Sequence, residues 1–121
     1  MPLADIVDVV WKAKPHAIQF EAANPRHAHE WTLFDDVELP EGKVLIPGVL
    51  EVQSNYIERT DLVAQRILRY ADWVGRDNVM AGTDCGFSIH VGTAAVDPDV
   101  VCAKLAALAQ GAERATRRLW P

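Results

Sequence analysis

Helix-like and strand-like segments alternate along this chain, and that alternation restricts the fold more than any other feature. The spacing of apolar residues, Pro and Gly predicts helices at residues 2–14, 27–34, 60–74 and from 98 onward. Strands are predicted at residues 16–22, 44–50 and 78–83. This order is typical of parallel strands joined by right-handed crossovers, so we predict an α/β fold.

Turn-forming and capping residues set the expected ends of these elements. Pro15 ends the first helix, Thr60 or Asp61 caps the third, and Gly75 ends it. The Pro47-Gly48 pair is expected to break or end the second strand. Residues 83–98 are predicted to form a long loop. The last helix is expected to bury five apolar side chains, Val101, Leu105, Leu108, Ala112 and Ala115.

Length and composition narrow the class of protein. The 121 residues suggest one domain spanning residues 1–121, and a net charge of −5 argues against a general nucleic-acid binder. No apolar run approaches the ~18 residues of a transmembrane helix, and the N-terminus lacks a basic region typical of a signal peptide. Two cysteines are too few for a disulfide framework. We therefore expect a cytoplasmic protein with no membrane or nucleic-acid partner.

Polar residues follow each predicted strand, at Glu21 and Asn24, at residues 51–55, and at Asp84 and Cys85. The carboxyl ends of parallel strands meet at one edge of a sheet, where reactive groups gather. Each residue alone has an ordinary explanation, such as a helix cap, a surface charge or a buried thiol. Together, Glu21 and Cys85 supply a carboxylate and a thiolate, which would form a partial zinc site.

Other residues could complete or border such a site. His27 or His29 could face it, although both fit a solvated helix face, and His90 lies in the loop after Cys85. Cys102 is expected to be a core residue of the last helix. The four tryptophans are expected to be packing residues, and Asp84 and Ser88 either shape a thiol pocket or hold the loop.

The segments FEAANPR, IPGVLEVQSNYIE and GTDCGF, within residues 16–117, resemble the C-terminal part of the cobalamin-independent methionine synthase family. That resemblance implies a zinc thiol methyltransferase with a (β/α)8 barrel, of which this chain would hold the last three βα units and a preceding helix. A complete barrel takes about 250 residues. The resemblance also implies Glu21 and Cys85 as zinc ligands, with Gln53, Asn55 and Asp84 as substrate-binding residues.

Two departures from the family pattern are visible. No His-x-Cys motif, the source of the other two zinc ligands, occurs in the chain, and it would stand before Met1. Gln53 occupies the position of the family's histidine acid. The chain therefore looks closer to short, divergent relatives that alkylate other thiols. We expect zinc-dependent methyl or alkyl transfer from a donor to a thiol, incomplete in this chain alone. The alternative is a non-catalytic remnant, or a subunit that pairs with another chain.

An open three-stranded sheet also predicts a partner. Its outer strands, residues 16–22 and 78–83, would present unpaired backbone groups. Four apolar side chains, Ile18, Phe20, Leu45 and Met80, are expected to face the interior of an unfinished barrel. We therefore expect the chain to form a homo-oligomer, or to associate with a polypeptide that supplies the missing half-barrel.

Overall fold

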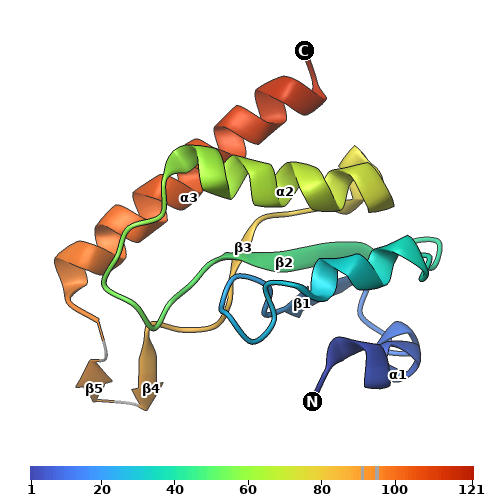
Figure 1. The fold of residues 1–121 in the computed structure, drawn as a ribbon, viewed down its shortest axis with the longest axis horizontal. Helices are drawn as coiled ribbons and strands as arrows, with labels where there is room; N and C mark the ends of the chain where they lie inside the picture. The colour runs from blue at the N-terminus through green and yellow to red at the C-terminus, as the bar shows by residue number, and fades with distance from the viewer. Residues whose placement is uncertain (91, 95) are drawn as a thin grey trace.

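The computed structural model describes residues 1–90, 92–94 and 96–121, with the backbone alone at residues 89, 90, 93 and 94. Two long helices, α2 and α3, lie together over one face of a three-stranded sheet (Figure 1). The elements, with η for 3-10 helices, are η1 (Leu3–Asp5), α1 (Val7–Trp11), β1 (Ala17–Phe20), η2 (Glu30–Asp35), β2 (Val44–Leu50), α2 (Thr60–Val74), η3 (Arg76–Asn78), β3 (Gly82–Thr83), β4 (Ser88–His90), β5 (Thr93–Ala94) and α3 (Pro98–Leu119).

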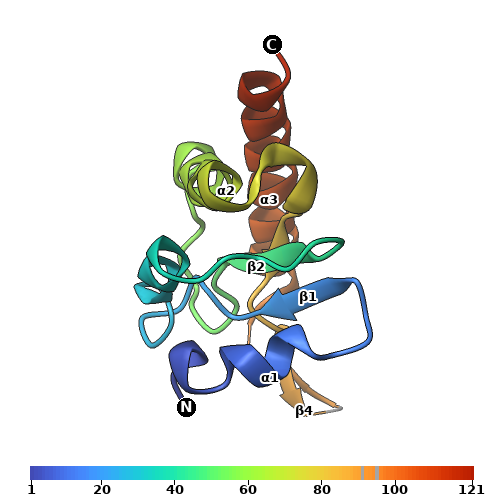
Figure 2. The same ribbon diagram turned by 90° about the vertical axis from the view of Figure 1, so that its right-hand side faces the viewer.

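The sheet has the order β1-β2-β3, and both neighbouring pairs are parallel. The predicted α/β class with three parallel strands is therefore confirmed. The described residues form an open sheet, and Figure 2 shows α1 beyond β1, on the side away from α2 and α3. No helix in the described part of the chain is long and apolar enough to cross a membrane.

Local sequence explains both long helices. Helix α2 places Val63, Ile67 and Tyr70 on one buried face, and it ends at Gly75, whose φ of 87° most side chains avoid. Its N-cap is Arg59, which makes no side-chain capping bond, so the predicted cap at Thr60 or Asp61 is wrong. Helix α3 begins as predicted, with the Asp97 carboxylate accepting a hydrogen bond from the Asp99 backbone N–H.

The buried face of α3 differs in part from the one predicted. Lys104, Ala107, Gly111 and Ala115 are buried, whereas Leu105 is 43% exposed. The cause is a close helix crossing: a Cβ on Gly111 would lie 2.5 Å from the Cβ of Val63. Small residues are therefore needed at this crossing. Of the five predicted residues, Ala115 is buried, Leu108 and Ala112 are partly buried against the same core cluster, and Leu105 is exposed. Cys102 is exposed as well, so its assignment to the core was wrong.

The side chains of β1 and β2 also point differently from the prediction. Phe20 packs edge-on against Tyr70 of α2, with ring centroids 5.9 Å apart, and Leu45 is fully buried in the same cluster. These residues fill the layer between sheet and helices and do not face a barrel interior. The opposite face of the sheet carries Gln19 and Ile46. These two side chains lie over Gly82, where an added Cβ would contact both of them.

Five local predictions require correction. The helix predicted at 2–14 is two short helices, η1 and α1, and the strand predicted at 78–83 is reduced to β3, Gly82–Thr83. Strand β2 continues through Pro47 and Gly48, because its ladder with the third strand is interrupted between the Leu45–Val79 bridge and the Gly48–Gly82 pair. No partner there requires the N–H that Pro47 lacks. Residues 30–35 form a 3-10 helix, and an antiparallel hairpin of β4 and β5 interrupts the predicted loop at 83–98.

Candidate functional site

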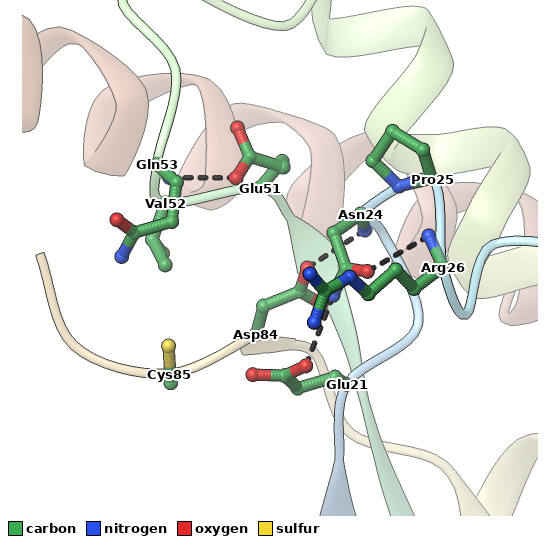
Figure 3. Close-up of a pocket in the computed structure, with 9 residues that line it drawn as sticks. All are labelled: Glu21, Asn24, Pro25, Arg26, Glu51, Val52, Gln53, Asp84 and Cys85. Atoms are coloured by element: carbon green, nitrogen blue, oxygen red, sulfur yellow. Dashed lines mark hydrogen bonds between the residues drawn. The ribbon is translucent and has the colours of Figure 1, made fainter. Parts of the chain in front are cut away.

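A pocket of about 530 Å³ opens where the carboxyl ends of β1, β2 and β3 meet (Figure 3). The loop after each strand contributes to its wall, as the parallel topology requires. Nine residues line it: Glu21, Asn24, Pro25, Arg26, Glu51, Val52, Gln53, Asp84 and Cys85.

Asp84 holds the loop after β1 in place. One carboxylate oxygen accepts hydrogen bonds from the backbone N–H groups of Ala22 and Ala23, both at 2.9 Å. The other accepts from the backbone N–H of Asn24 at 2.7 Å and from its side-chain amide at 3.0 Å. Asp84 is buried, and these four bonds use the hydrogen-bonding capacity of an ionised carboxylate. Its role in this structure is therefore to position the loop.

Gly48 makes this arrangement sterically possible. A Cβ at position 48 would lie 2.8 Å from the Cα of Asp84, closer than side chains tolerate. The Pro-Gly-Val segment of β2 therefore lets the loop after β3 cross directly over the strand. That crossing brings Asp84 within reach of the loop after β1.

Glu21 and Cys85 lie on the same side of the pocket (Figure 3). A Glu21 carboxylate oxygen accepts a hydrogen bond from the Asn24 amide at 3.1 Å and lies 3.7 Å from His27 Nε2. Partial burial, the neighbouring Glu21 carboxylate, and the negative charges of Glu21 and Asp84 raise the pKa of Cys85. A raised pKa keeps the thiol in its protonated form near neutral pH.

A buried charge network holds the loop after β2. Lys104 of α3 donates to the Glu51 backbone carbonyl at 2.9 Å and to the Glu58 carboxylate at 3.0 Å. The other Glu58 oxygen accepts the Glu51 backbone N–H, and the Glu51 side chain accepts the Gln53 backbone N–H at 2.6 Å. Burial alone would raise the pKa of Glu51, but hydrogen bonds from Ser54 and Gln53 and the charge of Lys104 lower it. This network fixes the turn that carries Gln53 to the pocket.

Four of the predicted site residues, Glu21, Gln53, Asp84 and Cys85, line this single pocket, whereas Asn55 is exposed and outside its lining. His27 faces Glu21 and also lies 2.8 Å from Glu30, although a solvated position was the favoured interpretation. The side chain of His90 lies outside the described residues.

Sequence reasoning missed Arg26, Glu58 and Lys104 as residues of the site or its support, and it placed Glu51 at the strand end without giving it a role. Arg26 stands within a quoted motif, so its position alone could have drawn attention to it. The buried Lys104 could not be found from local pattern, because its partners lie 46 and 53 residues away.

The donor set falls short of a self-contained zinc centre. Glu21 and Cys85 are suitable ligand types, but structural and catalytic zinc sites use three or four protein ligands. No group of three or more His, Cys, Asp or Glu side chains that could hold a metal is found among the described residues. The described part of this chain does not fit a complete zinc site.

Comparison with known proteins identifies the fold. A B12-independent methionine synthase from Shewanella sp. W3-18-1, solved in complex with selenomethionine, superposes with a TM-score of 0.78 at 24% sequence identity. The match covers 96% of this chain and 31% of that one. No family model matches, and no curated protein matches by sequence. The chain thus has the fold of about a third of a B12-independent methionine synthase.

Proposed function

We propose that this chain forms part of a zinc-dependent enzyme that transfers a methyl or alkyl group from a donor to a thiol. The carrying observation is that Glu21 and Cys85 line one pocket at the carboxyl ends of parallel strands. The fold shared with a B12-independent methionine synthase supports the same reaction class. A cytoplasmic setting suits two cysteines that are both unpaired and exposed.

In this proposal Glu21 and Cys85 supply two zinc ligands, and residues outside the described set supply the others. Zinc would provide the charge that keeps coordinated thiols deprotonated. The chain's own contribution is to position the two ligands. Asp84 fixes the loop that carries Glu21, and Asp84 directly precedes Cys85 in the sequence. Gln53 lines the pocket where the resemblance expects a histidine acid, and an amide offers hydrogen bonds but no titratable proton.

We infer that the missing metal ligands come from a partner. We expect an additional polypeptide segment, from an upstream half-barrel or a second copy, to cover the open face of the sheet and complete the metal shell. The competing function is a non-catalytic subunit or remnant, which the two-donor set also favours. Both alternatives predict that the isolated chain does not make methionine from homocysteine and methyltetrahydrofolate.

Cobalt substitution tests the metal half-site without requiring activity. Titration of the full chain with Co²⁺ should give a thiolate-to-metal charge-transfer band, weak in affinity because only two protein ligands contribute. The band should disappear in C85S and weaken in E21Q, while C102S, which removes the other exposed thiol, should leave it unchanged. A band that survives in C85S, or no band in the wild-type chain, would refute the assignment of Cys85 as a ligand.

A further inference from the structure

The wall of the pocket carries more negative than positive charge (Figure 3). Three carboxylates line it, those of Glu21, Glu51 and Asp84. Among the nine lining residues the cation belongs to Arg26, which is exposed. A cleft lined mostly by one sign of charge attracts ligands of the opposite sign, because its low-dielectric walls focus the field. The pocket therefore favours a positively charged ligand.

Glu51 gives this preference a second, independent basis. The residue is 5% exposed, and its Oε2 atom is buried without a hydrogen-bond partner in the described part of the chain. Lys104 lies behind the same turn, but its ammonium group pairs with Glu58 and bonds the Glu51 backbone carbonyl rather than the side chain. A buried carboxylate without a direct partner keeps much of its field, because little water screens it. That field acts across the wall, so a cation in the pocket does not need to touch Oε2.

The lining residues that the structure describes offer no free proton donor for a leaving group. Asp84 accepts four hydrogen bonds from N–H groups, which use its acceptor positions and leave it no proton to give. Glu51 is ionised near neutral pH because its pKa is lowered, while the Gln53 amide and a guanidinium do not release protons in proteins. Glu21 and Cys85 are set aside as the proposed metal ligands. A leaving group that departs as a strongly basic anion would therefore find no general acid here.

We propose that the group donor is an onium compound, in which the transferred methyl or alkyl group is bound to a positively charged sulfur or nitrogen. This inference rests on the proposed thiol-transfer function and names its donor. The acceptor thiol loses its proton to solvent, and its sulfur then forms a bond to the alkyl carbon. The bond from that carbon to the onium centre breaks, and its electron pair stays with the leaving group. A neutral sulfide or tertiary amine departs, so no general acid is needed.

Matched pairs of probes test the charge preference by ligand-observed NMR on the full chain. Choline is compared with 3,3-dimethylbutan-1-ol, in which carbon replaces the ammonium nitrogen. The (2-hydroxyethyl)dimethylsulfonium ion is compared with 3-methylbutan-1-ol, in which carbon replaces the sulfonium sulfur. Each cation should bind at least tenfold more tightly than its neutral partner at low salt, and added salt should reduce that preference. The ratio between the two cations shows which onium centre the pocket prefers.

Charge-neutralising variants then locate the effect in the pocket. E51Q keeps the size of the side chain and an oxygen for the Gln53 N–H. It should weaken both cations about fivefold or more and leave the neutral probes unchanged. E21Q should weaken the cations in the same way, and its side chain is 42% exposed, so it tests the charge even if E51Q does not fold. E38Q, which removes an exposed carboxylate outside the pocket, is the matched control and should change nothing.

The cobalt titration separates this inference from the proposed function. If onium cations bind in a Glu51-dependent way but Co²⁺ gives no thiolate band, the cation site stands and the thiol-transfer function fails. If the band appears and the cations bind no more tightly than their neutral partners, the function stands and the onium donor is wrong. Equal effects of E51Q, E21Q and E38Q on the cations, or no binding by any probe, would also overturn the onium donor.

Discussion

Replacing Lys104 with methionine should be among the most damaging single changes in this protein. The ammonium group and the Glu58 carboxylate are both fully buried and lie 3.0 Å apart. Methionine keeps the length and apolar character of the stem but leaves the Glu58 charge without its cation. It also leaves the Glu51 carbonyl without the donor that lies 2.9 Å away.

The size of the effect follows from this burial. Removing one partner of a buried ion pair costs about 3–5 kcal/mol, because the remaining charge is desolvated without compensation. A domain of this size has a total stability of about 5–15 kcal/mol, so the loss is a large share. The E58Q/K104M double variant removes both charges, so that no unpaired buried charge remains. The double variant should therefore lose less than the sum of E58Q and K104M.

Urea unfolding followed by circular dichroism measures these differences. R117M is the matched control on the same helix, because the Arg117–Glu113 pair is 77% and 63% exposed. Its loss should cost less than about 0.5 kcal/mol. A K104M variant as stable as R117M would refute the buried network. Strict additivity of K104M and E58Q would show that the two groups do not interact.

Three further predictions follow from single contacts. G111A should lower the free energy of unfolding by about 1–3 kcal/mol despite better helix propensity, because its Cβ would meet Val63, whereas G86A has open space and should be neutral in the same urea assay. The lowered pKa of Glu51 means that its contribution to stability is present at neutral pH and is lost as pH falls below about 4.3. E51Q should therefore flatten the acid limb of a stability–pH profile, and an unchanged limb would contradict the shift. In a C102S background, E21Q should move the iodoacetamide alkylation of Cys85 to lower pH, because Glu21 raises the pKa of that thiol.

Local pattern was sufficient for the main elements. The apolar spacing of residues 63, 67 and 70, with Gly75 after them, defines α2 without tertiary information. The topology rule for parallel strands then places the residues that follow each strand at one edge. Glu21, Gln53, Asp84 and Cys85 were identified in this way, although their sequence separation is as large as 64 residues.

Contacts between distant segments account for what pattern could not predict. The spacing of apolar residues in α3 predicts that its large apolar side chains are buried. In the structure, the close approach to Val63 requires a glycine at position 111, and Leu105 is exposed. A buried lysine contradicts the usual preference of its residue type. Lys104 is buried because Glu58 and the Glu51 carbonyl converge on it, and no local window contains all three.

The same tertiary contacts bear on how a zinc site could be completed. Metal sites often depend on the metal to order their ligand loops, since the site is not formed without it. Here the loop after β1 is held by four hydrogen bonds to Asp84, and the turn after β2 by Lys104 and Glu58. Hydrogen bonds within the chain therefore order Glu21 and its neighbours before any metal binds, so metal binding would lose less conformational entropy. In the proposed enzyme, the remaining ligands would join a rim that is already formed, and a partner would supply donors and a covering wall without having to fold this pocket.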